Sequence, residues 1–309
     1  MKELFLEYLS ALIGNLLRRS AISEKVRLGI GRIEAREIVD KKLTESEFQV
    51  FSQFGEDGII EKIIQTIDPI DTRFVEFGVE DYTESNTRFL LQHRNWKGLI
   101  IDGSRRNIRR IRKSELYWKY YLRARQEFVT AENINGILEQ EGFTGQIGLL
   151  SIDVDGNDYW IWKSIEVIIP SIVVVEYNSL WGSQLQLTTP YSSTFNRTKA
   201  HFSNQYFGAS AEALTALGRS KGYKLVHGNR EGTNLFFVHE RHSEIQEIAV
   251  SGAHRPIGSR QARDRRGRLT FEDPISSLDG ISEMPLVDPS SGDVRPIREI
   301  LTSQRNDEP

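Results

Sequence analysis

The sequence of 309 residues predicts an α/β fold: a mostly parallel sheet with helices on both faces and an antiparallel last strand. Short apolar runs alternate with helical patterns over residues 46–240, which is typical of strands joined by helices. Most of these runs are apolar at successive positions, as expected for strands that helices cover on both sides. The last two runs are separated by a short turn, so we expect them to pair antiparallel.

The first expected element is a helical, amphipathic arm at residues 1–45. Apolar side chains recur at helical spacing from Leu4 to Leu17. We expect this arm to pack on the core or on a second subunit, and the alternative is a peripheral helix on a membrane surface. The arm does not match a secretory signal, because Arg18 and Arg19 follow the apolar stretch instead of preceding it. No apolar run approaches the roughly 18 residues needed to span a bilayer.

Residues 46–240 form the predicted catalytic domain, in which a polar residue or a glycine directly follows each β-type run. The expected strands are Arg73–Phe77, Gly98–Ile101, Ile147–Ile152, Ser171–Val175, Tyr223–Val226 and Asn234–Val238. The expected helices are Glu56–Ile67, Glu84–His93, Arg105–Arg112, Asn133–Glu141, Tyr159–Ile165 and Ser210–Lys221.

Residues 241–309 differ from the rest in composition. Phe271 is their one aromatic residue, and Pro, Ser, Gly, Asp and Arg dominate the segment. Such a composition buries little apolar surface, so we expect a polar tail that is extended or disordered.

The overall composition excludes several classes of protein. The absence of cysteine excludes disulfides, thiolate nucleophiles and cysteine-based metal sites, and it is compatible with a cytoplasmic location. The net charge of −3 argues against nucleic acid as a partner, because proteins that bind it usually carry a basic surplus. Neither a P-loop nor a G-x-S-x-G elbow is present.

Acidic residues lie at the carboxyl ends of four of the expected strands: Glu76, Asp102, Asp153 and Glu176. In an open parallel sheet, ligands bind in the crevice beyond the carboxyl ends of the strands. A single carboxylate at such an end is readily explained as a helix cap. Four of them at one edge indicate a ligand site.

The loop after the first strand indicates which ligand to expect. It contains Gly78 but no G-x-G-x-x-G, and it continues with Glu80 and Asp81, which would repel a pyrophosphate. This argues against NAD and FAD and favours S-adenosylmethionine, which has a sulfonium and an adenosine but no phosphate. Asp102 is placed to accept hydrogen bonds from a ribose diol.

A second group of oxygen ligands follows the third and fourth expected strands, Ile147–Ile152 and Ser171–Val175. We expect Asp153, Glu176 and Asn178 to bind Mg²⁺ or a similar cation, and the alternative is a set of hydrogen-bonded carboxylates around a ligand and helix ends. A metal there would lower the pKa of an acceptor hydroxyl. Asp155 is the candidate carboxylate for making that hydroxyl more nucleophilic.

The long polar loop at residues 181–207 is a candidate lid or substrate pocket, with a packed surface loop as the alternative. His201 is its candidate general base, since an unperturbed histidine titrates at about pH 6.5.

Several segments, in this order, resemble FkbM-type methyltransferases over residues 50–240. They are residues 52–57 (SQFGED), 74–79 (FVEFGV), 85–87 (SNT), 96–102 (WKGLIID) and 150–156 (LSIDVDG). The resemblance implies a Rossmann-like class I methyltransferase fold with seven strands in the order 3-2-1-4-5-7-6. It also implies S-adenosylmethionine as cofactor and O-methylation of sugars or natural products, as in polysaccharide biosynthesis.

The resemblance also implies roles for individual residues. Asp102 would hold the ribose, and residues 129–132 would approach the adenine. The residues at Asp153, Glu176 and Asn178 resemble the Mg²⁺ site of catechol and macrocin O-methyltransferases. The implied cofactor contacts are Gln53, Asp57, Glu76, Gly78, Asp102, Glu132 and Asp153.

The sequence therefore predicts an S-adenosylmethionine-dependent O-methyltransferase that acts on a hydroxyl of a small-molecule or glycan acceptor, with metal assistance. One alternative is a non-catalytic binding protein on a degenerate methyltransferase fold, since the first loop lacks the usual glycines. Another is a metal-dependent hydrolase that uses Asp153, Asp155 and Asp158.

Overall fold

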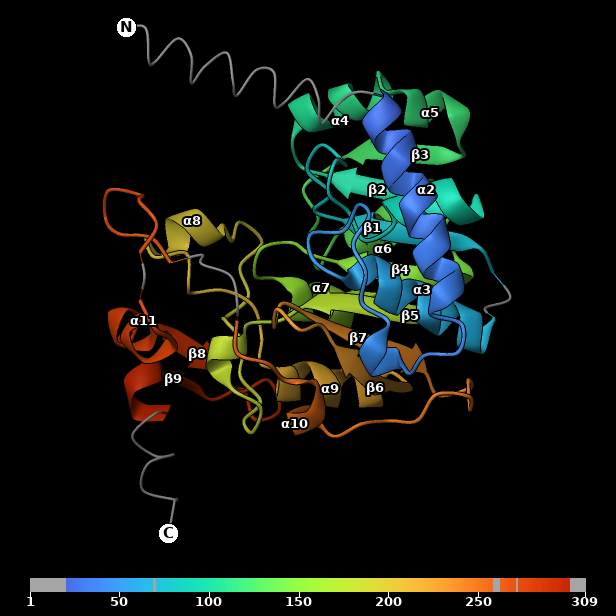
Figure 1. Cartoon of the computed structure of the whole chain (residues 1–309). Helices are drawn as coiled ribbons and strands as arrows, with labels where there is room; N and C mark the ends of the chain where they lie inside the picture. Colours follow the sequence, from blue (N-terminus) through green and yellow to red (C-terminus); the bar gives the residue numbers. More distant parts are fainter. Residues whose placement is uncertain (1–20, 69–70, 258–261, 271, 301–309) are drawn as a thin grey trace, which may run out of the picture.

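A computed structural model describes residues 21–68, 71–257, 262–270 and 272–300 (Figure 1). Its centre is a seven-stranded sheet in the order β3-β2-β1-β4-β5-β7-β6. Only β7 runs antiparallel to its neighbours in this sheet. The order is the one that the family resemblance implies, and the predicted fold class is confirmed. The strands are β1 (Arg73–Phe77), β2 (Lys97–Asp102), β3 (Leu122–Gln126), β4 (Gly145–Ile152), β5 (Ile168–Glu176), β6 (Tyr223–Gly228) and β7 (Asn234–His239).

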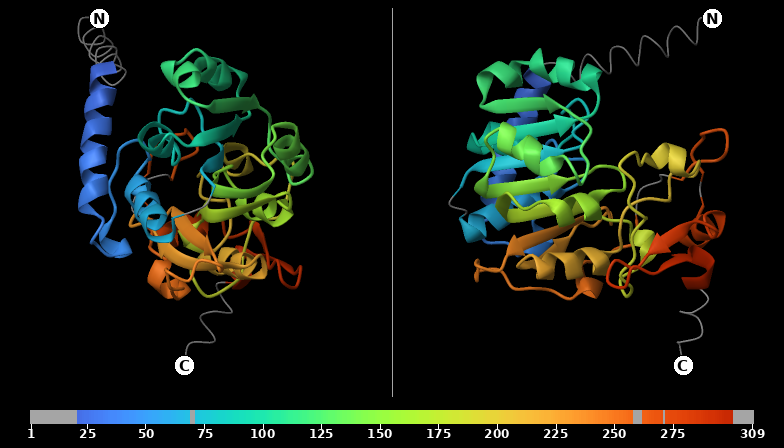
Figure 2. Two further views of the ribbon diagram at one scale, coloured as in Figure 1. Left: turned by 90° about the vertical axis from the view of Figure 1, so that its right-hand side faces the viewer. Right: turned by 180° about the vertical axis from the view of Figure 1, so that it is seen from behind.

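The central strands are apolar on both sides because two separate cores flank the sheet. Along β4, Leu149 packs into one core and Leu150 into the other. Helices α3 (Glu56–Ile67), α4 (Arg105–Arg112) and α5 (Glu115–Lys119) cover the first face. The second face is covered by α6 (Ile134–Gln140), α7 (Asp158–Ser164) and α9 (Ala211–Ser220), as the views of Figure 2 show.

Strand β3 is the one strand of the sheet for which the sequence analysis gives no range. It lies at the edge of the sheet and pairs only with β2. Leu122 and Ala124 are buried, whereas Arg123 is exposed. Buried and exposed side chains alternate along β3 instead of forming an apolar run. A search for short apolar runs therefore detects the central strands but not this one.

The predicted helix Glu84–His93 is wrong in its first half. Regular helical structure begins only at Arg88 and continues as η2 (Leu90–Arg94), one turn of π-helix. The carboxylate of Glu76 accepts hydrogen bonds from Ser85, Asn86 and Thr87, and these bonds hold that segment in an irregular loop.

The described part of the N-terminal arm consists of α2 (Ala21–Glu37) and η1 (Leu43–Glu45). Helix α2 packs outside α3, where Leu28 and Ala35 contact the cluster formed with Phe51 and Phe89. Residues 1–20 of the predicted arm lie outside the described residues. Within the described residues, no helix combines the length and apolar composition needed to cross a bilayer.

The expectation of an extended or disordered tail does not hold for four stretches of the described residues after 241, whereas residues 258–261, 271 and 301–309 of the predicted tail lie outside the described residues. The four stretches are α10 (Val250–Ala253), α11 (Pro274–Gly280), β8 (Pro285–Val287) and β9 (Val294–Pro296). Figure 1 shows α11, β8 and β9 with α8 (Arg197–Ala200), beyond one end of the strands of the large sheet.

The C-terminal elements are ordered because they share a core with the long loop after β5. Leu286 and Ile297 are buried against Trp181 and Tyr206. The hydroxyl of Tyr206 also donates to the carbonyl of Pro285, at 2.5 Å. The few apolar residues of the tail therefore complete a core that begins elsewhere in the chain, which composition alone does not reveal.

We predict that Leu286→Ala lowers the free energy of unfolding by about 2 to 5 kcal/mol, because Leu286 is 2% exposed and truncation leaves a cavity. Val294→Ala on the paired strand β9 is the control, since Val294 is 58% exposed and its loss costs less than about 0.5 kcal/mol. Urea denaturation measures both values. Equal effects of the two substitutions would contradict the packing of this segment.

Candidate active site

A cavity of about 400 Å³ opens beyond the carboxyl ends of β1, β2, β4 and β5. We call it the acidic cavity, because the charged residues that line it within the described part of the chain are carboxylates and a single cation, Arg197. The four acidic residues at the strand ends all reach it. Its carboxylates come from Glu76, Glu80, Glu84, Asp102, Glu127, Asp153, Asp155 and Glu176.

Gly78 marks the point where the loops after β1 and β4 meet. It has a φ of 72°, in the left-handed region, and a Cβ at this position would lie 1.6 Å from the carbonyl oxygen of Asp153. No side chain fits there, so glycine is required both for the backbone conformation and for the close approach.

Glu76 lines the cavity, but both of its carboxylate oxygens accept hydrogen bonds from the loop at residues 85–87. Its Oε1 accepts from the backbone N–H of Asn86 at 2.9 Å, and its Oε2 accepts from the hydroxyls of Ser85 and Thr87. Asn86 in turn donates to Ser151 Oγ, at 3.1 Å, on the neighbouring strand β4. Burial raises the pKa of Glu76, and the hydrogen bonds oppose this rise. Glu76 therefore shapes the cavity wall by anchoring residues 85–87.

Asp102 ends β2 on the cavity wall and fixes the loop that follows. Its Oδ1 accepts from the backbone N–H of Ser104 at 2.7 Å and from Asn107 Nδ2 at 3.3 Å. Ser104 is the residue that caps α4, so Asp102 is not a helix cap. Burial raises the pKa of Asp102.

The residues after β3 that line the cavity are not the one predicted, Glu132. Glu127, Phe128 and Val129 line the acidic cavity. Glu132 does not: it is exposed and accepts a hydrogen bond from the Tyr191 hydroxyl at 2.6 Å. The predicted contact of Glu132 with a cofactor is therefore not supported.

The two cofactor contacts predicted around the start of α3, Gln53 and Asp57, have different surroundings in the structure. Gln53 lines the cavity. Asp57 is buried away from it, and its Oδ2 accepts from the backbone N–H groups of Val50, Phe51 and Ser52 at 2.7–2.8 Å. Burial raises the pKa of Asp57 from 3.8 to about 6. Asp57 holds the loop in place and cannot contact a ligand in the cavity.

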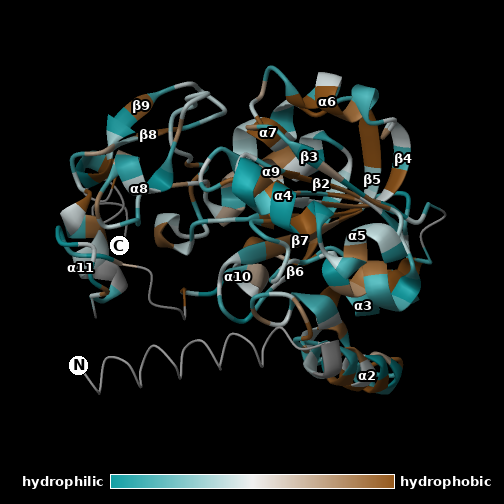
Figure 3. Ribbon diagram, turned by 90° about the horizontal axis from the view of Figure 1, so that it is seen from above, coloured by the Kyte–Doolittle hydropathy of each residue, from teal (hydrophilic) through white to brown (hydrophobic). Residues whose placement is uncertain are grey.

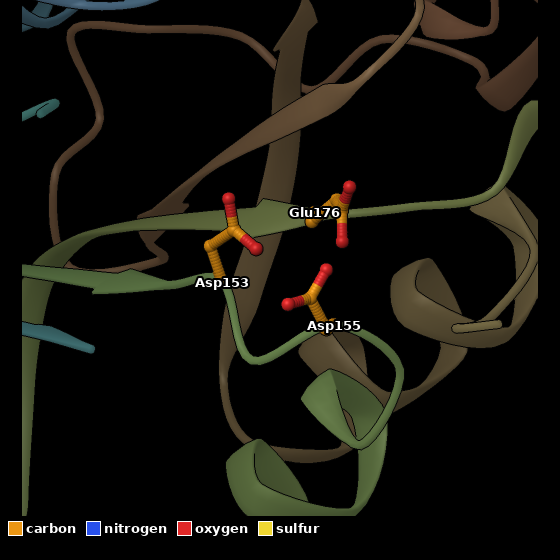
Figure 4. Close-up of side chains that lie close together, drawn as sticks. All are labelled: Asp153, Asp155 and Glu176. Carbon is orange, nitrogen blue, oxygen red and sulfur yellow. The ribbon is translucent and has the colours of Figure 1, made fainter. Parts of the chain in front are cut away.

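Three carboxylates converge at the ends of β4 and β5 (Figure 4). One oxygen from each of Asp153, Asp155 and Glu176 lies within 4.8 Å of the others. Asp153 is exposed within the cavity, whereas Glu176 is 8% exposed and its buried Oε2 has no hydrogen-bond partner among the described residues. Desolvation by the surrounding protein and the neighbouring carboxylates raise the pKa of both Asp153 and Glu176 well above their ordinary values. We call these three residues the carboxylate triad.

The turn after β4 sets the position of Asp155. Asp155 has a φ of 56°, which few residues other than glycine adopt without strain. Asp158 stabilises this turn, because its two oxygens accept from the backbone N–H groups of Val154 and Gly156 at 2.9 and 3.0 Å. Burial raises the pKa of Asp158 from 3.8 to about 6.

Arg197 is a site residue that the sequence analysis missed. Its Nη1 lies 3.7 Å from Asp155 Oδ1 and 3.6 Å from Glu176 Oε1. Its guanidinium stacks 3.5 Å from the centre of the Phe207 ring, and its Nε donates to the carbonyl of Asn204 at 2.8 Å. The predicted lid loop supplies this residue, but no motif distinguishes Arg197 from the other arginines of the chain.

Asn178 is not available as a metal ligand. Its Nδ2 donates to the carbonyls of Gln205 and Phe207 at 2.9 and 3.0 Å, and its Oδ1 accepts from the backbone N–H of Leu180. The side chain is buried and ties the lid loop to the end of β5. Asp155 takes the place in the carboxylate triad that the sequence analysis gave to Asn178.

His201 lies outside the residues that line the acidic cavity. Its Nδ1 is 2.8 Å from Ser203 Oγ, and its ring packs on Phe202. Burial and the nearby Arg265 lower the pKa of His201. The structure therefore does not support His201 as the general base.

The sequence matches no protein-family model and no curated protein. Among solved structures, the chain is similar to the N-terminal domain of EvdMO1 with SAH bound, with a TM-score of 0.40 and 14% identity over 68% of this chain and 95% of that one. It is also similar to a S-adenosylmethionine-dependent methyltransferase from Clostridium acetobutylicum ATCC 824 (TM-score 0.39, 9% identity, 60% and 90% of the two chains). The fold assignment depends on the strand order described above.

We predict that Asp57→Asn changes the pH dependence of stability. The unfolded chain releases the Asp57 proton near pH 3.8, whereas the folded chain keeps it up to about pH 6. The folded state therefore binds more protons in this window, and the contribution of Asp57 to the free energy of unfolding falls as the pH rises through it.

The variant lacks this titration, so its stability should fall less steeply than that of the wild type across the same window. Urea denaturation at several pH values measures the two slopes, with exposed Glu139→Gln as the control. Identical slopes for Asp57→Asn and the wild type would show that folding does not raise the pKa of Asp57.

Proposed function

We propose that this protein is an S-adenosylmethionine-dependent O-methyltransferase acting on a hydroxyl of a sugar, glycan or natural product. The observation that carries the proposal is the acidic cavity at the carboxyl edge of the sheet, lined by Asp102 and by the loop at Gly78. Eight carboxylates and one cation disfavour a phosphate-bearing cofactor and favour a ligand with a positive centre. The strand order is the one that the FkbM resemblance implies.

The shape of the acidic cavity supports this cofactor. Its volume, about 400 Å³, lies in the range of small-molecule sites. Asp102 is placed to accept hydrogen bonds from a ribose diol, and Phe128 and Val129 offer apolar surface to a purine ring. Gly78 leaves the backbone open to a ligand that approaches the loop after β1. S-adenosylmethionine supplies an activated methyl group on its sulfonium.

The residues of this chain would orient the acceptor and manage its proton. Asp155 reaches the cavity with a largely exposed carboxylate, which would accept the proton of the acceptor hydroxyl. Arg197 compensates part of the negative charge, since it lies within 4 Å of Asp155 and Glu176. The lid loop that carries Arg197 would also exclude water and hold the acceptor in line, which is the main contribution an enzyme makes to such a displacement.

As the alternative to proton transfer to Asp155, the carboxylate triad would hold a divalent cation such as Mg²⁺. The donor set fits this role, because it offers carboxylate oxygens from three residues and includes the unpartnered, buried Oε2 of Glu176. When bound, such a cation lowers the pKa of a coordinated hydroxyl. The same triad also suits a metal-dependent hydrolase, which would be active without the cofactor and inhibited by EDTA.

We predict that the full chain binds S-adenosylhomocysteine with a micromolar Kd and that Asp102→Ala weakens this binding by about tenfold to a hundredfold. The loss corresponds to hydrogen bonds made to a charged acceptor. Isothermal titration calorimetry measures the binding. Glu132→Ala is the control, because Glu132 lies outside the acidic cavity and its loss should leave the Kd unchanged.

Absence of binding by a folded wild-type sample would overturn the proposal. Binding without methyl transfer to any member of a panel of hydroxylated sugars and phenols would instead support a non-catalytic binding protein.

We predict that Mn²⁺, used as a probe for Mg²⁺, binds to the carboxylate triad and does so more tightly at about pH 8 than at about pH 6. The carboxylates must lose their protons to bind a metal, and burial raises the pKa of Asp153 and Glu176. Glu176→Gln should weaken binding at least about tenfold in calorimetry.

Glu84→Gln is the matched control, since Glu84 also lines the cavity but lies outside the triad. A Kd that does not depend on pH, or equal losses in the two variants, would assign the metal to another position.

A further inference from the structure

A second cavity, of about 520 Å³, lies on the other side of the loop at residues 79–84. We call it the basic cavity, because Arg88, Arg106, Arg109, Arg110 and Lys113 line it, and Asp81 is the one acidic residue among the described residues of its lining. It shares no lining residue with the acidic cavity. The proposed methyltransferase activity gives it no role.

The cations of the basic cavity come mainly from one face of α4. Arg106, Arg109, Arg110 and Lys113 follow the spacing i, i+3, i+4 and i+7, which places their side chains in one row along the helix. The opposite face carries Ile108, which is buried in the core. Figure 3 shows the hydrophilic colouring of α4 above the sheet.

Only part of this positive charge is compensated. Arg110 forms an ion pair with Asp81, and Arg88 lies 3.0 Å from Glu24 of α2. Within the part of the chain that the structure describes, Arg106, Arg109 and Lys113 form no ion pair with a carboxylate. Like charges at i, i+3 and i+4 destabilise a helix, and an anion between them would remove this repulsion.

We propose that the basic cavity binds phosphate groups, and that Arg106 and Arg109 are its principal ligands. A guanidinium donates two parallel hydrogen bonds to phosphate oxygens, and Lys113 adds a third cation next to them. Three uncompensated cations around one hollow match a phosphoryl group better than a carboxylate, which carries one charge and two oxygens.

Two sources of this phosphate are compatible with the surroundings of the cavity. One is a soluble compound with a phosphate or pyrophosphate, and the other is the headgroup of an anionic lipid. The lipid source would use exposed apolar side chains next to the cavity. Helix α2, which contacts Arg88 through Glu24, exposes Val26 and Ile30, and α5 exposes Trp118.

The test uses the full chain and two probes. Calorimetry with pyrophosphate measures the soluble form, and flotation with phosphatidylglycerol vesicles, against phosphatidylcholine vesicles, measures the lipid form. Arg109→Gln should weaken binding of the responsive probe by about tenfold, and Arg109→Lys by less, because lysine keeps the charge. Arg105→Gln is the matched control: it removes the same charge from the same helix but does not line the cavity, and its effect should stay within about twofold.

Pyrophosphate binding with no preference for anionic vesicles identifies a soluble ligand, and vesicle binding alone identifies a lipid. Failure of both probes to bind the wild type overturns the proposal, as does an Arg105→Gln variant that loses as much affinity as Arg109→Gln. Both positions are exposed, and circular dichroism confirms that the variants fold. S-adenosylhomocysteine binding, measured in the same samples, keeps a failure here distinct from a failure of the proposed function.

Discussion

The contact between Gly78 and the carbonyl of Asp153 is the constraint on which the acidic cavity depends. Because β1 and β4 are neighbours in the sheet, the loops that follow them leave it side by side and must share one narrow space. Gly78, directly after β1, leaves room for the loop after β4 to turn sharply. That turn holds Asp155 in a left-handed conformation. Glu76 then fixes residues 85–87 above the same edge. The cavity is thus a consequence of strand order combined with one missing side chain.

The sequence predicts the central sheet well because apolar runs report burial on both faces, and β1, β4 and β5 are buried on both. It fails where local pattern and tertiary contact disagree. Strand β3 alternates because it lies at the edge, and residues 84–87 have a helical pattern but are held by the carboxylate of Glu76. The tail is polar on average, yet Leu286 completes a core with Trp181 from a distant loop. Leu286 and Trp181 are too far apart in the sequence for the composition of any one segment to reveal their contact.

Much the same division applies to the candidate site. Strand ends are fixed by topology, so Asp102, Asp153 and Glu176 could be placed together from the sequence. Side chains outside the strands depend on hydrogen bonds that the sequence does not reveal. Asp57 and Asn178 lie near the carboxyl edge of the sheet, but neither serves a ligand. Asp57 is buried away from the cavity, and backbone groups occupy both the amide and the oxygen of Asn178. Arg197 reaches the carboxylates from the lid loop, whose path no periodicity describes.

The loop at residues 79–84 separates two cavities of opposite charge, and its successive residues Glu80 and Asp81 face different ones. The net charge of −3 conceals this polarity. An anion held on the basic side makes the electrostatic potential on the acidic side more negative, so it strengthens the attraction of that side for a cationic ligand. Thermodynamic reciprocity then requires the cationic ligand to strengthen anion binding by the same factor. Two sites that share no residue would in this way communicate through Coulomb forces, without any movement of the chain.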